Sequence, residues 1–349
     1  MGTAMNLDDL FQLALSKRAS DILLSPGAPA TLRVEGVLES ATNNRLTGAQ
    51  VDAAASVLLD PESLAKVHER VEYSGAADFG GERFRVSAYL RDRSVALALR
   101  HVPKSVATPE VLGLPAVMSD LVGRAQGLLL FAGASGQGKS TSQASLIDFL
   151  NRTTNRHVVT IEDPIEYVHV SQKCMIDQRE IGRDSLSYEA ALTHAMRENP
   201  DVILVGEMRS REAISAAIML AEMGHLVLST VHANDAVQTL HRILHTFSSE
   251  SRGQVRMQLS LSLIGVLCQR LVLSKEGKLK LAAELLINTP AIAGQIREDR
   301  LEQIYNSMEL DASSGMITMN HSLQNLVDKG VVDARVAERF MNAFQTRRR

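Results

Sequence analysis

The chain contains no tryptophan, and only 4% of its 349 residues are aromatic. Proteins that hold single-stranded nucleic acid commonly stack the bases on aromatic side chains, so this composition argues against such a ligand. The sequence has 37 basic and 40 acidic residues, which gives a formal net charge of -3 and no global basic field. Nucleic acid is therefore not expected as a partner.

Cysteine is nearly absent as well, because Cys174 and Cys268 are the only two in the sequence. They lie far apart and form no C-x-x-C pair, so we expect neither a zinc site nor a disulfide framework, and a reducing cytoplasm fits. The N-terminus lacks a signal pattern of basic and then apolar residues. The longest apolar stretch, residues 259–268, is too short to cross a bilayer and is predicted to be a buried helix. We expect a cytoplasmic protein whose contact with a membrane is peripheral, and a solvated tail at residues 347–349, which are all arginine.

A length of 349 residues with 45% hydrophobic side chains suits two domains with sizeable cores. Residues 1–102 mix short helical and strand patterns, which predicts an α+β N-terminal domain. A linker is predicted over residues 103–118, where three prolines cluster. Residues 119–349 are predicted to form the second domain.

Three local patterns stand out in the N-terminal domain. Apolar residues within 7–14 recur at helical spacing and predict an amphipathic helix. Residues 32–38, interrupted by Gly36, predict a small hairpin. Residues 83–90 alternate between apolar and polar side chains, which predicts a half-buried strand.

Residues 133–140, with the sequence GASGQGKS, form a complete phosphate-binding loop of the pattern G-x-x-x-x-G-K-[ST]. An apolar run at 127–132 predicts a buried strand before the loop, and residues 141–150 predict a helix whose positive N-terminal end faces the phosphates. The ammonium group of Lys139 is expected at the β- and γ-phosphates, and the Ser140 hydroxyl at Mg²⁺. We therefore expect a nucleoside triphosphate with Mg²⁺, held by Ala134, Ser135, Gly136, Gln137, Gly138, Lys139, Ser140 and Thr141.

Downstream of the loop, short apolar runs alternate with helical patterns. Strands are predicted at residues 157–161, 202–205 and 226–229, and helices at residues 187–197 and 211–223. Such alternation implies a parallel sheet covered by helices, that is, an α/β fold with a RecA-like core. From residue 252 onward the pattern is mainly helical, with one further strand over 283–287, and predicts a helical C-terminal extension.

Phosphoryl transfer also needs a carboxylate that holds the metal and a group that orients or deprotonates water. Glu207 follows the apolar run 202–205, at the strand end where open α/β sheets bind ligands. It is the Walker B candidate for Mg²⁺, although Gly206 stands where many such ATPases carry aspartate. Three acidic residues of one segment are candidates for the second role, and the sequence alone does not rank them: Glu162, Asp163 and Glu166.

Arg85 and Arg100 flank the polar turn of residues 91–94 in the N-terminal domain. A hairpin centred between positions 92 and 93 sets the two arginines directly opposite each other. Like charges so placed destabilise a sheet unless an anion lies between them, and a triphosphate is the obvious anion. The pair are therefore candidate arginine fingers, acting within the chain or on a neighbouring subunit. Arginines on a solvated strand face are the alternative interpretation.

Two histidines flank the predicted strand at residues 226–229. His232 follows the strand, in a polar segment that can sense the γ-phosphate. His225 precedes it and is more simply explained as a neighbour of a helix cap or as an interface contact.

Taken together, these segments make the chain resemble the type IV pilus retraction ATPases, the PilT and PilU family of hexameric secretion motors. The similarity covers nearly the whole sequence. Its matching segments are residues 133–141 (Walker A), 160–169 (Asp box), 202–209 (Walker B), 224–233 (His box), 178–180, 83–100, 291–292 and 296–299.

The resemblance implies ATP hydrolysis with Mg²⁺ by a chain with a PAS-like N-terminal domain, a flexible linker and a RecA-like domain. It implies that Glu166 is the general base, that Glu207 is the Walker B carboxylate and that Arg85 and Arg100 are the fingers. It further implies that His225 and His232 form the His-box pair.

The resemblance also implies a homohexamer that works against a pilus platform protein of the inner membrane, alone or with a paralogous retraction ATPase. The loop departs from the family pattern at Ala134, Ser135 and Gln137, where the family commonly has proline, threonine and serine. Residues 232–234 and 288–290 are closer to PilU, whereas residues 296–299 are closer to PilT, so the subtype stays open.

Other functions share the same core. Pilus assembly and type II secretion ATPases generally carry a four-cysteine zinc module, which two isolated cysteines cannot build. A DNA-translocating motor would need a basic channel face and would bind single strands with a steep salt dependence. A nucleotide-binding adaptor that hydrolyses little is the alternative that is not an enzyme. The combination of two carboxylates and two arginines argues against it.

Overall fold

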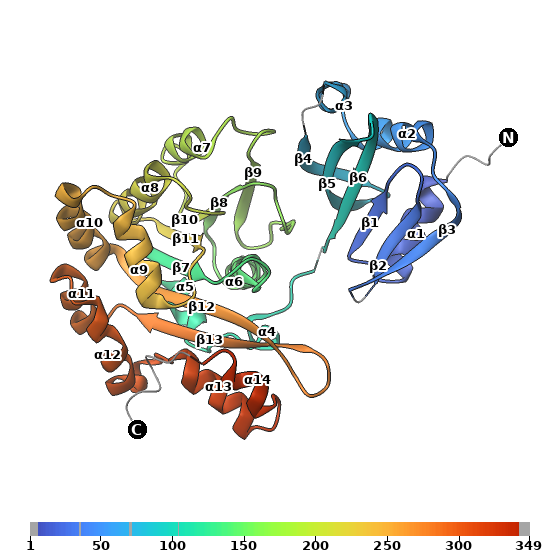
Figure 1. Cartoon of the computed structure of the whole chain (residues 1–349). Helices are drawn as coiled ribbons and strands as arrows, with labels where there is room; N and C mark the ends of the chain where they lie inside the picture. The colour runs from blue at the N-terminus through green and yellow to red at the C-terminus, as the bar shows by residue number, and fades with distance from the viewer. Residues whose placement is uncertain (1–5, 35, 70–71, 104, 342–349) are drawn as a thin grey trace. The chain divides into compact units, whose positions relative to one another are not determined.

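The computed structural model describes residues 6–34, 36–69, 72–103 and 105–341, so the predicted arginine tail at 347–349 lies outside the described residues. The chain divides into two compact units (Figure 1). The first comprises Met1–Ser105 and the short segment Asp163–Val168, and the second comprises Val106–Glu162 and His169–Arg349. The segment predicted as a linker therefore joins the second unit from Val106 onward.

The first unit is an α+β structure with an antiparallel sheet in the order β3-β2-β1-β6-β5-β4. Its strands are β1 (Asp21–Leu24), β2 (Pro29–Val34), β3 (Val37–Arg45), β4 (Tyr73–Phe79), β5 (Glu82–Arg91) and β6 (Ser94–Val102). Its helices are α1 (Leu7–Ser16), α2 (Gly48–Leu58) and α3 (Pro61–His68). A single apolar cluster between helices and sheet forms the core of this unit.

The local predictions for the first unit are confirmed. Helix α1 buries Leu10, Phe11 and Ala14 on one face and starts at Asn6, whose side chain accepts a hydrogen bond from the Asp8 N–H. Strands β2 and β3 form the hairpin that turns at Gly36. The alternation predicted for residues 83–90 is seen in β5, where alternate side chains are buried.

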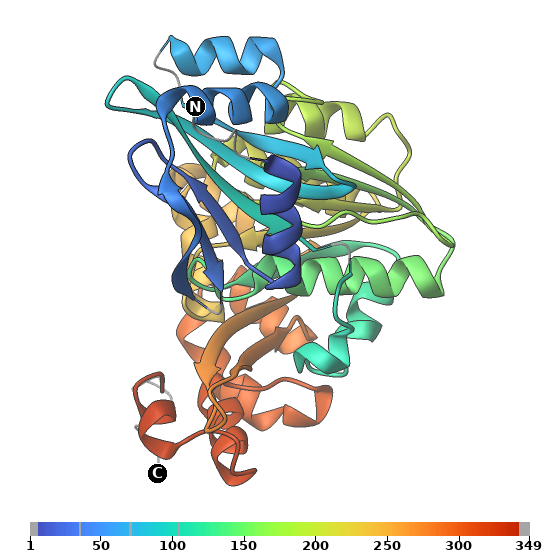
Figure 2. The same cartoon turned by 90° about the vertical axis from the view of Figure 1, so that its right-hand side faces the viewer.

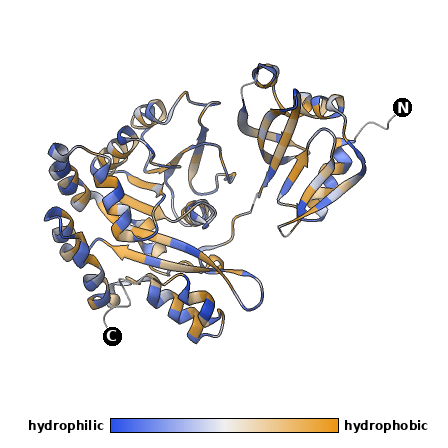
Figure 3. Ribbon diagram, in the orientation of Figure 1, coloured by the Kyte–Doolittle hydropathy of each residue, from blue (hydrophilic) through white to orange (hydrophobic). Residues whose placement is uncertain are grey.

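The second unit is built on a seven-stranded sheet in the order β13-β12-β7-β11-β10-β8-β9. All neighbouring strands are parallel except β13, which pairs antiparallel with β12. The strands are β7 (Gly127–Ala132), β8 (His157–Glu162), β9 (Met175–Glu180), β10 (Val202–Val205), β11 (Leu226–Val231), β12 (Leu263–Leu273) and β13 (Leu279–Ile287). The central strands β7, β10 and β11 are buried on both faces, as Figure 3 shows by their apolar colour.

Helices cover both faces of this sheet (Figure 1). Helices α4 (Pro109–Leu112), α5 (Met118–Gly123) and α6 (Lys139–Thr153) pack together on one side. Helices α7 (Tyr188–Ala195), α8 (Arg211–Glu222), α9 (Ala236–His245) and α10 (Ser249–Ser262) follow on the other side, where α8 contacts both α7 and α10. The predicted strands and helices of the α/β region are thus present, with ends that differ by a few residues.

The prediction of a helix over residues 259–268 is wrong in its second half. Helix α10 ends at Ser262, and the chain continues directly into strand β12, which pairs in parallel with β7. A short apolar run fits a buried helix and a buried strand equally well, so periodicity does not separate the two. Gly265 marks the strand, because a Cβ atom there would lie 2.5 Å from the carbonyl oxygen of Leu286 on β13.

The C-terminal part is helical after the β12–β13 hairpin. It contains α11 (Pro290–Arg297), α12 (Ile304–Leu310), α13 (Met319–Asp328) and α14 (Ala334–Glu338), with the short 3₁₀ turns η1 (Leu301–Gln303) and η2 (Ala312–Ser314). Figure 2 shows the hairpin, in orange, reaching toward α13 and α14, in red. These two helices and the hairpin share a small apolar core of their own. Among the described residues, no helix combines the length and apolar character needed to cross a membrane.

Candidate nucleotide-binding site

The phosphate-binding loop leaves the sheet at the carboxyl end of β7 and runs into α6. Gly136 and Gly138 have φ values of 76° and 85°, in the left-handed region that other residues rarely adopt. A Cβ atom on Gly133 would lie 2.8 Å from the carbonyl oxygen of Gln269, because β12 passes close to the loop. The glycines are therefore required by the backbone, and they leave N–H groups accessible to an anion.

Lys139 is the first residue of α6 and is only 8% exposed. Its ammonium group donates hydrogen bonds to the carbonyl oxygens of Gly133 and Ala134, at 2.8 and 2.9 Å. The unpaired N–H groups at the start of a helix give that end a partial positive charge, and here Ser140 and Thr141 belong to the first turn. The loop, the lysine and the helix end together form a site for a polyphosphate.

Strand β12 braces this loop through two glutamines. The backbone N–H of Leu271 donates to the side-chain oxygen of Gln137 at 2.7 Å. On the same strand, the amide of Gln269 donates to the hydroxyl of Ser142 at 2.7 Å and so ties α6 to the sheet. The side chain of Gln137 is therefore used to attach the loop to β12. Gln269 was not among the predicted site residues, because no strand was predicted over residues 263–273.

Glu207 and His232 come together beside the loop. They follow β10 and β11, two neighbouring parallel strands whose carboxyl ends share one edge of the sheet. Nε2 of His232 lies 3.2 Å from Oε1 of Glu207, and the guanidinium of Arg209 donates to Oε2 at 2.8 Å. A Cβ atom on Gly206 would lie 2.9 Å from the Tyr188 hydroxyl and 3.2 Å from the carbonyl oxygen of Ile161, so a larger residue would be crowded there.

A cavity of about 480 Å³ adjoins the loop at this edge. Arg242 of α9 donates a hydrogen bond from Nη1 to the carbonyl oxygen of His232 at 2.9 Å. Gln238 and Arg242 are four residues apart and therefore share one face of α9, a spacing that could have indicated them in advance. The cavity is lined by Ala134, Ser135, His232, Ala233, Asn234, Gln238 and Arg242.

His225 lies at the opposite edge of the sheet. It precedes β11, whereas His232 follows it, and strand β11 separates them by roughly 20 Å at about 3.3 Å per residue. Nδ1 of His225 forms a hydrogen bond with the carbonyl oxygen of Pro200 at 2.8 Å. Within one chain, His225 therefore lies far from His232, and its role in the His-box pair that the resemblance implies stays a prediction.

The acidic segment after β8 is divided between the two units. Glu162, the last residue of β8, accepts hydrogen bonds from the Thr160 hydroxyl at 2.7 Å and the Gln178 amide at 3.2 Å. Its carboxylate is thus engaged in holding the strand ends together. Asp163 and Glu166 belong to the segment that groups with the first unit, where Oε1 of Glu166 lies 3.9 Å from Nη1 of Arg85.

Arg85 and Arg100 lie directly opposite each other on β5 and β6, as the hairpin register predicts. The turn between the strands uses Asp92 and Arg93 with φ of 48° and 63°. Asp21 on β1 supplies an anion for one of them, since Nε of Arg100 donates to its Oδ1 at 2.9 Å. The carboxylate of Asp21 therefore offsets part of the repulsion between the two arginines. From the sequence, a triphosphate was the only anion expected to do so.

The glycine-rich loop before α6, the parallel sheet and the carboxylate that follows β10 at the same edge of the sheet define a P-loop nucleotide-binding protein. Comparisons with known proteins are more specific. The family model described as Type II/IV secretion system protein matches residues 83–330. The chain is 39% identical to the type IV pilus retraction ATPase PilT of Pseudomonas aeruginosa over 94% of its own length and 96% of that protein. It is 38% identical to the type IV pilus ATPase PilU of the same organism, over 94% of the chain and 86% of PilU.

Solved structures agree with the sequence comparison. A crystal structure of the pilus retraction motor PilT with bound ADP matches with a TM-score of 0.90 and 38% identity, over 97% of each chain. The ATPase DotB of Legionella pneumophila matches with a TM-score of 0.82 and 26% identity, over 95% of this chain and 94% of DotB. The chain belongs to the type II/IV secretion system family and, within it, to the PilT and PilU group of type IV pilus retraction ATPases. The assignment made from the sequence is confirmed, and with it the class of enzyme, an ATPase.

Proposed function

We propose that this chain hydrolyses ATP to drive retraction of a type IV pilus, the motion that underlies twitching motility. The observation that supports it most is the set of groups gathered at one edge of the sheet: the phosphate loop, Glu207 and His232. They occur in a chain that matches PilT, a retraction motor crystallised with ADP, over nearly its whole length.

The residues present fit a nucleotide with Mg²⁺. The loop glycines admit an anion to the backbone N–H groups, and the Lys139 ammonium is held over the loop by two carbonyl oxygens. The Ser140 hydroxyl and the Glu207 carboxylate are the oxygen ligands that would hold the metal. Mg²⁺ held there would supply positive charge that offsets the negative charge of the phosphates.

The remaining groups take the roles of a phosphoryl-transfer site. Glu166 accepts a proton from the attacking water. His232, which lies 3.2 Å from Glu207, links the Walker B carboxylate to the segment that senses the γ-phosphate. Arg85 and Arg100 act as arginine fingers on the nucleotide of a neighbouring subunit, which can contribute about 10³–10⁵ in rate.

This assignment of fingers implies an assembly. We propose a homohexamer in which each first unit, a PAS-like domain, serves the adjacent nucleotide, in the cytoplasm at the inner membrane. An inner-membrane pilus platform protein is the partner against which it works, and a paralogous retraction ATPase is a second candidate partner. Retraction is favoured over type II secretion because PilT is matched over 96% of its length, whereas type II secretion protein E of Pectobacterium carotovorum is matched over 52%.

A mixing experiment tests the proposal. Lys139→Ala removes the loop ammonium, and Arg85→Ala removes one finger; each variant alone is expected to release phosphate from ATP at least about 10²-fold more slowly than the wild type. If the finger acts on the neighbouring subunit, mixing the two before assembly restores activity at about a quarter of the interfaces. Mixtures that stay inactive would place the finger and the loop in one chain.

The adaptor alternative has its own outcome. If the unmodified protein is already as slow as Glu166→Gln and Arg85→Ala, the chain binds nucleotide without working as a motor. In cells, loss of the motor should leave surface fibres that extend but never shorten.

A further inference from the structure

Strand β13 carries a carboxylate in the interior of the second unit. Glu284 is 0% exposed, although ionisable side chains are rarely buried so completely without partners. Its Oε1 accepts a hydrogen bond from the backbone N–H of Ala236 at 2.8 Å, and its Oε2 accepts one from the N–H of Met319 at 3.2 Å. Ala236 is the first residue of α9, and Met319 is the first residue of α13.

One side chain therefore holds the starts of two helices that are far apart in sequence. The first N–H groups of a helix have no partner within it, and that end carries partial positive charge. A buried carboxylate between two such ends satisfies both, and their charge compensates for its desolvation. Asp235, the cap of α9, is also buried, and its Oδ1 accepts from the Gln238 N–H at 2.8 Å.

The surroundings show how dry this region is. Cys268 lies opposite Glu284 in the register of β12 and β13. Burial raises the pKa of the Cys268 thiol, and the charges of Glu284 and Asp235 raise it further. Burial and the same two carboxylates raise the pKa of the Tyr305 hydroxyl. Glu284, Asp235 and Cys268 are thus all buried in the same region.

The α9 end of this connection leads to the nucleotide cavity. The polar segment 232–234 enters α9 directly through Asp235, and Gln238 and Arg242 of α9 line the cavity. Arg242 also fixes the segment by donating to the carbonyl oxygen of His232. A displacement of the start of α9 therefore displaces side chains that line the cavity beside the phosphate-binding loop.

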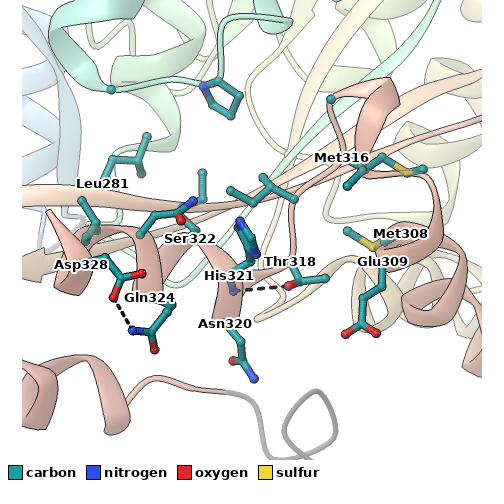
Figure 4. A pocket seen from close by; sticks show the side chains of 18 of the residues that line it. Leu281, Met308, Glu309, Met316, Thr318, Asn320, His321, Ser322, Gln324 and Asp328 are labelled. Atoms are coloured by element: carbon teal, nitrogen blue, oxygen red, sulfur yellow. Dashed lines mark hydrogen bonds between the residues drawn. The ribbon is translucent and has the colours of Figure 1, made fainter. Parts of the chain in front are cut away.

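The α13 end is packed less completely. A separate cavity of about 1030 Å³ adjoins the first turns of α13, between this helix, β13 and α12. Figure 4 shows Thr318, His321, Ser322 and Gln324 facing it from the helix, with Met308 and Met316 opposite, and marks the hydrogen bond from the His321 N–H to the Thr318 hydroxyl. Met319 itself is buried in the small apolar core of α13, α14 and the hairpin, so its bond to Glu284 is one of several contacts that tie the start of α13 to β13.

We propose that Glu284 is a positioning residue that couples the nucleotide cavity to the C-terminal helices: its carboxylate fixes the start of α9 for catalysis and links α13 to the same point. The inference rests on the proposed ATPase function and deepens it. The coupling is reciprocal, so nucleotide in the cavity should hold α13 more firmly, and a partner that moves α13 should change turnover.

Glu284→Gln tests whether the carboxylate fixes the start of α9 for catalysis. The shape of the side chain changes little, but one of the two N–H groups then faces an amide NH₂ and loses its acceptor. We expect kcat for ATP to fall about tenfold or more, with KM changed by less than about threefold, because ground-state binding rests on the phosphate loop. Asn288→Ala is the matched control. It removes partly buried hydrogen bonds to Ser260 and Leu263 just after β13, without touching α9 or α13, and should leave kcat unchanged.

Three outcomes are distinguishable. A wild type that hydrolyses no ATP defeats the proposed function and leaves nothing for Glu284 to position. A wild type that turns over, with Glu284→Gln equal to it, overturns the positioning role alone. A fall in kcat that Asn288→Ala reproduces at equal thermal stability shows a merely structural effect and also overturns it.

The proposed link between the nucleotide cavity and α13 is measured on the unmodified protein. It can therefore be tested even if Glu284→Gln does not fold. Amide hydrogen exchange of α13 is compared with and without ADP. We expect exchange in its first turn, including the Met319 N–H, to slow severalfold on adding ADP, while α14 changes little. Identical exchange in both states would overturn the coupling.

Discussion

At its amino edge and at its carboxyl edge, the parallel sheet of the second unit carries the same kinds of side chain, histidines and carboxylates. The amino edge holds His157, Asp201 and His225, and the carboxyl edge holds Glu162, Glu207 and His232. Composition therefore does not tell which edge is functional. The difference lies in what the groups face.

Side chains at the amino edge tie the polypeptide to itself. The carboxylate of Asp201 accepts from the His157 N–H at 2.8 Å, and His225 bonds the carbonyl oxygen of Pro200. At the carboxyl edge, His232 faces a cavity shared with the phosphate loop and contacts Glu207. Strand direction is the cause, since loops that follow parallel strands converge with helix N-termini at this edge alone.

Replacing one carboxylate at each edge should give the largest difference in activity between the two edges. Glu207→Gln removes the charge that holds the metal, so we expect kcat to fall about 10²-fold or more, with thermal stability nearly unchanged. Asp201→Asn keeps an oxygen for the His157 N–H and should cost at most about 1 kcal/mol of stability and little activity. Phosphate release and thermal melting of both variants provide the measurement. Comparable losses of activity would mean that the amino edge also serves the nucleotide.

Substitutions of the two histidines should change kcat less than those of the carboxylates, but they compare the same residue type at the two edges. His232→Gln removes the ring that contacts Glu207 and should lower kcat about tenfold. His225→Gln should change kcat less than about twofold, because the residue is some 20 Å away across the strand. ATP turnover is measured on the assembled protein, and ADP affinity on the dilute monomer. A loss of turnover for His225→Gln with unchanged ADP affinity of the monomer would show that this histidine acts across a subunit interface.

The loop, its flanking strand and the pairing of Arg85 with Arg100 could be predicted because each depends on local sequence. Glycine spacing fixes the loop, an all-apolar run fixes β7, and turn position fixes a hairpin register. The placement of His225 before β11 and of His232 after it was likewise predicted, because it depends only on the bounds of one strand.

Strand β12 could not be predicted, because its apolar residues, 263–268, follow a helix without a turn and carry no period of their own. Gln269 lies on β12 and was therefore not predicted either. Its role depends on a contact with Ser142, which is far away in the sequence. The role of Glu284 is equally non-local, since its two partners are the backbones of Ala236 and Met319. Tertiary packing, not local preference, decides all three.

A substitution of Gln269 should give the smallest effect of the variants compared between the two edges. Gln269 does not line the cavity and contacts the carboxyl edge only through Ser142 of α6. Gln269→Met keeps the volume and removes the hydrogen bond from its amide to the Ser142 hydroxyl, which is buried. The free energy of unfolding should fall by about 1 kcal/mol, the usual net contribution of such a bond. Affinity for ADP should weaken about two- to fivefold, because α6 and its N–H groups are held less firmly.

Gln258→Met is the matched control, since it removes an amide that bonds Glu222 at the exposed surface of α10, away from the loop. It should leave both quantities nearly unchanged. Calorimetric titration with ADP and denaturant unfolding provide the numbers. A Gln269→Met protein that loses stability yet binds ADP as tightly as the wild type would show that β12 supports the sheet only. A parallel loss of both would show that the strand missed by sequence analysis belongs to the nucleotide site.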